Sequence, residues 1–188
     1  MSGARPSTTA AVIMRREHIG NRWQPWRWVL AEVVPQEAAF GGAGSEGSEP
    51  RLIYQNDSEQ RWLHAGFTVE LFQDDAEGYY LNATTDAPCW FVLWRMEEEP
   101  TLAAEPIARV QAGSLSYHDA GRWLDAQETV DQVPAGPDVV QWLRDFVAEH
   151  HRPEPKRRQR PESFKPLTDR FGSPASVTTV KKSGGGHG

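Results

Sequence analysis

Cysteine is almost missing from this sequence, since Cys89 is the one example among 188 residues. A single thiol excludes an internal disulfide, a four-cysteine zinc site and an iron–sulfur cluster held by cysteines. Cys89 comes directly before the apolar run of residues 90–96. We therefore expect a small buried hydrophobic side chain at this position and not a nucleophile.

Long hydrophobic runs are missing as well. No segment of the sequence approaches the roughly 20 apolar residues that a membrane-spanning helix needs. The first apolar stretch, residues 10–14, is too short for the hydrophobic part of a signal peptide. Together with the scarcity of cysteine, this predicts a protein of the cytoplasm.

Recognisable catalytic and cofactor-binding motifs are the third absence. The glycines of residues 41–47 do not join a strand to a helix with the spacing of a phosphate-binding loop. Ser114 follows Gly113 without the flanking pattern of a nucleophilic serine. We interpret residues 97–99, three glutamates, as a solvated loop, and His150 and His151 as cationic residues at a helix end. The sequence predicts no catalytic, metal or cofactor site.

Charge is present but unevenly placed. The net charge of the chain is −6, yet residues 152–188 hold nine Lys and Arg against three Asp and Glu. This tail therefore carries +6 and the preceding 151 residues carry −12. An acidic body with a basic arm is the main large-scale feature of the sequence.

Hydrophobic periodicity predicts an α+β fold that is mostly β. The predicted domain, residues 9–152, is a small barrel or a bent antiparallel sheet with one or two C-terminal helices, followed by an extended basic tail at residues 153–188. Strands are predicted at residues 10–16, 26–34, 51–55, 62–72, 79–84, 90–96, 107–112 and 128–133. Helices are predicted at residues 116–126 and 137–151, the second beginning at a proline.

The tail leaves three interpretations open. It is a solvated arm, it docks on an acidic protein surface, or it contacts nucleic acid, although the acidic body would repel phosphate. Two phenylalanines in the tail favour a protein groove, because they offer apolar anchors. The tail residues concerned are Lys156, Arg157, Arg158, Arg160, Phe164 and Phe171.

Several segments together resemble a proteobacterial family of unknown function. The resemblance spans residues 10–160, and its motifs are structural rather than catalytic. They are Ala11–Arg16 (AVIMRR), Asn21–Trp26 (NRWQPW), Trp62–Phe67 (WLHAGF), Glu77–Asn82 (EGYYLN), Phe91–Glu98 (FVLWRMEE), Ser114–Val133 and Trp142–Pro155. Members of that family are encoded beside molybdenum- or tungsten-dependent formate dehydrogenases.

The resemblance implies a non-catalytic small subunit or accessory protein that binds such a formate dehydrogenase. From composition, charge and the missing motifs we expect no cofactor of its own and no nucleic acid or membrane partner. One alternative is an assembly chaperone of that molybdoenzyme. Another is a small-ligand-binding β-barrel, whose polar residues would come from Arg95, Tyr79, His64 and Glu70.

The expected partner-binding surface combines the basic tail with exposed tryptophans. The chain has eight tryptophans, and large aromatic side chains either fill a core or anchor an interface. We expect Trp23 and Trp26 to belong to the second group, together with the six tail residues named above.

Overall fold

The computed structural model of this chain describes residues 4–35 and 49–154. The chain divides after Arg152, and of the second part only Pro153 and Glu154 are described. The predicted basic tail from residue 155 onward and residues 36–48, which include the glycines of residues 41–47, therefore lie outside the described residues.

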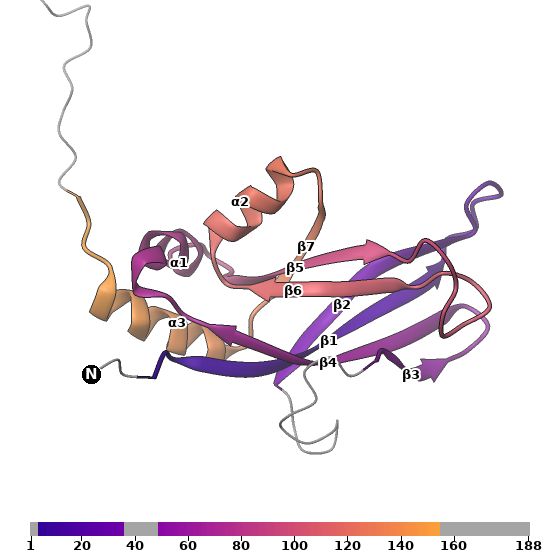
Figure 1. The fold of residues 1–188 in the computed structure, drawn as a ribbon, viewed down its shortest axis with the longest axis horizontal. Coiled ribbons are helices and arrows are strands. Elements are labelled where there is room, and N and C mark those ends of the chain that lie inside the picture. The colour runs from indigo at the N-terminus through magenta and orange to yellow at the C-terminus, as the bar shows by residue number, and fades with distance from the viewer. Residues whose placement is uncertain (1–3, 36–48, 155–188) are drawn as a thin grey trace, which may run out of the picture. The chain divides into compact units, whose positions relative to one another are not determined.

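A four-stranded antiparallel sheet is built from the first part of the chain (Figure 1). Its strands follow the order β2-β1-β4-β3, so that β2 and β3 form the two edges. Their bounds are β1 (Ser7–His18), β2 (Trp26–Pro35), β3 (Arg51–Gln55) and β4 (Glu59–Glu70).

A second, three-stranded antiparallel sheet lies against the first. Its order is β6-β5-β7, with the most apolar strand in the centre, where both faces are covered. The strands are β5 (Cys89–Met96), β6 (Ala108–Ser114) and β7 (Thr129–Pro134). Val12 and Met14 of β1 pack against Val92 of β5 and Val110 of β6, which joins the two sheets in one core.

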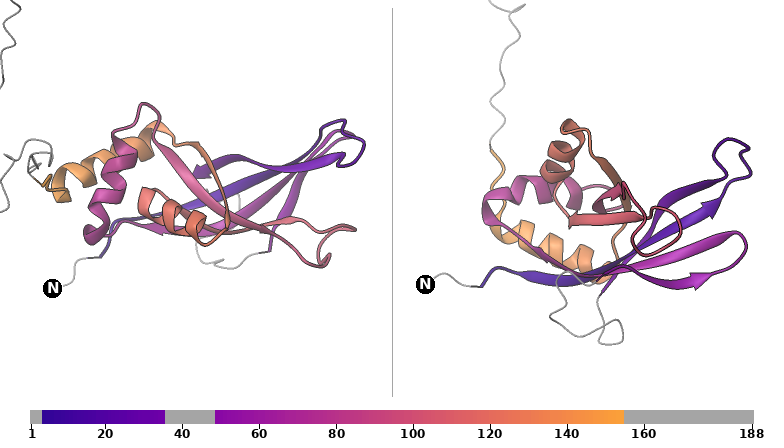
Figure 2. Two further views of the ribbon diagram at one scale, coloured as in Figure 1. Left: turned by 90° about the horizontal axis from the view of Figure 1, so that it is seen from above. Right: turned by 45° about the vertical axis from the view of Figure 1, so that its right-hand side comes forward.

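Three helices complete the fold: α1 (Ala76–Ala83), which follows a short 3-10 turn at Gln73–Asp75, α2 (Tyr117–Asp125) and α3 (Pro137–His150). Ser116 caps α2, because its hydroxyl accepts hydrogen bonds from the backbone N–H groups of His118 and Asp119. Leu143 and Phe146 of α3 are buried in a cluster with Tyr79 of α1. Figures 1 and 2 show α1 and α3 together at one end of the sheets.

The mixed α+β class, mostly sheet, is confirmed, and the described residues form two sheets rather than a closed barrel. Cys89 is buried, as expected, and burial raises the pKa of its thiol. Trp62 and Trp90 are also core residues. No helix in the described parts of the chain is long and apolar enough to cross a membrane.

The prediction of a strand at residues 79–84 is wrong, because this segment forms most of α1. The consecutive tyrosines favour a strand by local propensity. Tertiary contacts decide otherwise: the ring of Tyr79 packs edge-on against Phe146 at 5.6 Å. Asn82, fully buried, donates to the backbone oxygens of Cys89 (2.8 Å) and Leu115 (2.9 Å).

Candidate functional site: a hairpin end that carries tryptophans

The connection between β1 and β2 forms a closed hairpin tip, which we define as residues 19–25. The N–H of Ile19 donates to the carbonyl of Pro25 at 2.9 Å, and Asn21 Oδ1 accepts from the N–H of Trp23 at 2.9 Å. Gly20 has a φ of 67°, a conformation that favours glycine. These hydrogen bonds and the conformation of Gly20 therefore fix the backbone of the tip, and with it the directions of its side chains.

Trp23 is the most exposed large hydrophobic residue of the described chain, with 91% of its surface accessible. Ile19 beside it is 39% exposed. A tryptophan that contributes nothing to the core leaves a large rigid apolar surface in water, and such residues are the usual anchors of protein interfaces.

The hairpin tip is braced by the β3–β4 turn. The N–H of His18 donates to the carbonyl of Ser58 at 2.9 Å. In that turn, Asn56 Oδ1 accepts from the N–H groups of Ser58 and Glu59, both at 2.8 Å. Figures 1 and 2 show both turns and the β5–β6 loop at the same end of the sheets, away from α1 and α3.

Trp26, the second predicted tryptophan, is partly buried rather than exposed. The guanidinium of Arg16 lies over its ring, 4.6 Å from the centroid, and His18 meets it edge-on at 5.1 Å. Arg16 pairs across the sheet with Trp28 on one side and Gln60 on the other, so these side chains share one face.

That face and the β5–β6 loop enclose a cavity of about 250 Å³, which we call the tryptophan cleft. The N–H of Glu97 donates to the carbonyl of Ile107 at 3.0 Å and closes the loop that carries Glu105. Glu105 pairs with Arg16. The cleft is lined by Arg16, Trp26, Trp28, Gln60, Ala103, Ala104, Glu105, Pro106 and Ile107.

The opposite face of the same sheet carries paired charges. Glu17 binds Arg27 and Arg15, and Glu59 binds Arg61 and Arg15. The hydrogen bond from Arg27 lowers the pKa of Glu17, which keeps this carboxylate ionised. These exposed pairs orient each other and contribute little to stability.

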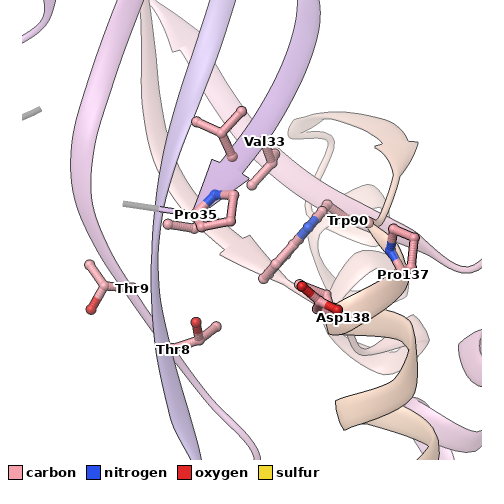
Figure 3. A pocket seen from close by; sticks show the side chains of 11 residues that line it. Thr8, Thr9, Val33, Pro35, Trp90, Pro137 and Asp138 are labelled. Atoms are coloured by element: carbon pink, nitrogen blue, oxygen red, sulfur yellow. The ribbon is translucent and has the colours of Figure 1, made fainter. Parts of the chain in front are cut away.

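A second cavity, of about 260 Å³, lies where the start of β1 and the end of β2 meet the start of α3 (Figure 3). Its walls are mostly apolar, with Val33, Pro35, Trp90 and Pro137 among them. Asp138 is its one titratable lining residue in the described chain. Its described lining residues therefore form an apolar hollow with only one charged side chain.

The four polar residues that would serve a ligand-binding barrel do not line a common cavity in the described part of the chain. His64 is buried, its Nε2 lies 3.1 Å from the carbonyl of Ala108, and burial lowers its pKa from 6.5 to about 4. Burial likewise raises the pKa of Tyr79 to about 12. Arg95 pairs with Glu128, the residue directly before β7, and Glu70 pairs with Arg5.

Serine, histidine and aspartate do meet between α1 and α2, but not as a nucleophilic set. His118 Nδ1 lies 2.7 Å from Asp75 Oδ1. Ser116 is fully buried and its hydroxyl accepts from the backbone at the start of α2. A serine nucleophile needs an accessible hydroxyl with a base within reach, so this cluster is structural.

Within the described residues, no group of three or more His, Cys, Asp and Glu side chains could hold a metal ion. The six predicted tail residues, Lys156, Arg157, Arg158, Arg160, Phe164 and Phe171, lie outside the described residues. Of the predicted surface, the structure therefore describes Trp23 on the hairpin tip and Trp26 in the tryptophan cleft.

Sequence reasoning missed Arg16, Gln60 and Glu105 as members of this site. Because side chains alternate between the two faces of a strand, the sequence could have placed Arg16 and Trp28 on the same face of the hairpin as Trp26. Glu105 lies 89 positions after Arg16 in the sequence, and no local sequence pattern indicates that the two residues meet.

The fold is that of a mixed α+β protein with two antiparallel sheets, and the most exposed large hydrophobic residue of its described chain lies on the hairpin tip. The chain belongs to the family described as "Protein of unknown function (DUF3305)", whose sequence model matches residues 9–160. No curated protein and no solved structure matches the chain.

Proposed function

We propose that this protein is a non-catalytic small subunit or accessory protein that binds a molybdenum- or tungsten-dependent formate dehydrogenase in the cytoplasm. The observation that carries the binding role is Trp23, 91% exposed on a hairpin tip that hydrogen bonds hold in place. An exposed aromatic residue on a rigid element loses little conformational freedom on binding, which favours affinity.

The identity of the partner is supported by the family resemblance, which implies a gene setting beside formate dehydrogenases. The single cysteine supports a role without an iron–sulfur cluster of its own. The basic residues of the tail would contribute electrostatic attraction, which salt screens. The apolar surface of the hairpin tip would contribute hydrophobic contacts, which salt does not screen.

Co-purification from the native host tests this proposal. Tagged full-length protein should retain the dehydrogenase at low salt, and Trp23→Ala should reduce the retained amount. Leu124→Ala is the matched control, because Leu124 is also an exposed apolar residue (58%) but lies on α2. Loss of retention in both variants, or in neither, would contradict an anchor at Trp23.

The same experiment separates a stable subunit from an assembly chaperone. A subunit elutes with the mature enzyme at a fixed ratio in size-exclusion chromatography, whereas a chaperone is found with the immature enzyme and is absent from the mature one. We favour the stable subunit, because a long basic arm suits permanent attachment. A tagged chain that never retains the dehydrogenase would count against both forms.

A further inference from the structure

The tryptophan cleft has the chemistry of a carboxylate receptor. Four of its lining residues, Arg16, Trp26, Trp28 and Gln60, carry side chains with N–H hydrogen-bond donors. Gln60 Oε1 accepts from Trp62 Nε1 at 3.3 Å, which leaves the Gln60 amide nitrogen as the group that can donate elsewhere. Glu105 is the one acidic residue among the nine described lining residues.

Arg16 is held ready for a bound carboxylate. Its side chain is 16% exposed and stacks on Trp26, which His18 in turn contacts edge-on. A guanidinium fixed in this way loses little freedom when it binds, and its planar fork matches a carboxylate better than an ammonium does.

The carboxylate of Glu105 already pairs with the guanidinium of Arg16. The Glu105 side chain is 65% exposed and belongs to the β5–β6 loop. Ion pairs with an exposed partner are weak. A carboxylate of another protein that also gains apolar contacts at the hairpin tip can therefore replace Glu105.

The volume of the tryptophan cleft limits the size of the group that it can bind. A cavity of about 250 Å³ is smaller than the usual site of a cofactor or drug-sized ligand, roughly 300–1,000 Å³, and suits one side chain. We propose that the tryptophan cleft binds an aspartate or glutamate side chain of the partner protein, and that Glu105 is an internal competitor for this site. This inference rests on the proposed partner-binding function and names what the surface recognises.

Indole N–H signals of the full-length ¹⁵N-labelled protein provide the test, since each of the eight tryptophans gives its own signal. The probes are the capped peptide Ala-Leu-Glu-Leu-Ala, the same peptide with Gln in place of Glu, and sodium formate. The Glu peptide should shift the Trp26 and Trp28 signals of the Glu105→Gln protein at a several-fold lower concentration than in the unmodified protein, as expected when a weak internal ion pair is removed. Arg16→Gln should abolish these shifts, and Arg16→Lys should weaken them.

Arg27→Gln is the matched control, because Arg27 lies on the same hairpin but pairs with Glu17 on the other face of the sheet. It should bind the Glu peptide as the unmodified protein does. Equal shifts with the Gln peptide, equal shifts with formate at the same concentration, or no shift in Glu105→Gln would overturn the proposal. Should Arg16→Gln fail to fold, the comparison of Glu105→Gln with the unmodified protein still decides.

The outcome is distinguishable from that of the proposed function. If the dehydrogenase is retained by the protein and by both Arg16→Gln and Glu105→Gln to the same extent, the cleft inference fails while the binding role stands. If the dehydrogenase is never retained but Glu105→Gln binds the Glu peptide several-fold more tightly than the unmodified protein does, the cleft recognises an acidic side chain of another partner.

Discussion

At the scale of single residues, a few small or polar side chains fix the positions of the larger ones. Gly78 in α1 shows this most clearly. A Cβ atom at that position would lie 2.3 Å from Ser116 Oγ and 2.6 Å from Asp75 Oδ1. The close approach of α1 to the start of α2 therefore requires glycine.

Replacement of Gly78 by alanine should destabilise the protein by about 1–3 kcal/mol, the usual cost of overpacking. Gly121→Ala in α2 is the control, because nothing lies within 4 Å of its Cβ position. That control should instead stabilise by about 0.5–1 kcal/mol through helix propensity. Urea unfolding measures both, and equal effects would refute the packing explanation.

His64 makes stability depend on pH. Burial lowers the pKa of its imidazole from 6.5 to about 4 in the folded protein. Between these two values the unfolded chain binds a proton at this position and the folded protein does not. Stability is therefore full above pH 6.5 and decreases as the pH falls toward 4.

The decrease attributable to His64 should be about 3 kcal/mol in the free energy of unfolding. His64→Gln, which keeps a side-chain N–H for the carbonyl of Ala108, removes the titrating group. Unfolding measured from pH 7 to pH 4 should show a shallower decrease in this variant. Parallel curves for the two proteins would show that His64 does not titrate as described.

At the scale of elements, the hydrophobic pattern predicted where most strands and helices lie. The predicted strand at residues 51–55 coincides with β3, and the proline at the predicted start of the last helix is the first residue of α3. These elements carry their own signals, an apolar period or a cap. α1 does not, because what holds it is the bonding of Asn82 to Cys89 and Leu115, contacts that no local pattern encodes.

Asn82→Ala should therefore destabilise the protein far more than the substitution of an exposed residue at the same end of α1. It leaves the N–H of Cys89 and two carbonyl groups without their partner, at about 1–3 kcal/mol for each buried group. Thr84→Ala is the control, because the exposed Thr84 hydroxyl bonds only the carbonyl of Tyr80. Thermal unfolding should show a large loss for the first and a small loss for the second; a similar loss for both would contradict this account of α1.

The site was less predictable than the elements that carry it. Trp23 and Trp26 were expected to be exposed members of the partner-binding surface. Their different environments, one exposed and one stacked under Arg16, depend on the pairing of β1 with β2 and β4. Glu105 enters the tryptophan cleft only because the β5–β6 loop returns to the first sheet.

At the scale of the whole molecule, the buried cluster of the helices and the proposed binding surface lie at opposite ends of the sheets. The buried clusters of Tyr79, Asn82, Leu143 and Phe146 join the helices at one end. The hairpin tip, the β3–β4 turn and the β5–β6 loop gather at the other (Figures 1 and 2). Substitutions at the hairpin tip should thus change binding without changing the stability of the fold.

The most direct test is the affinity of the purified dehydrogenase for the full-length protein and for Trp23→Ala. An anchor residue is expected to contribute about 2 kcal/mol or more, so Trp23→Ala should weaken binding by about 30-fold or more at unchanged thermal stability. Leu124→Ala should bind as the unmodified protein does. Equal affinity for the unmodified protein and Trp23→Ala would contradict the claim that the hairpin end is the partner-binding surface.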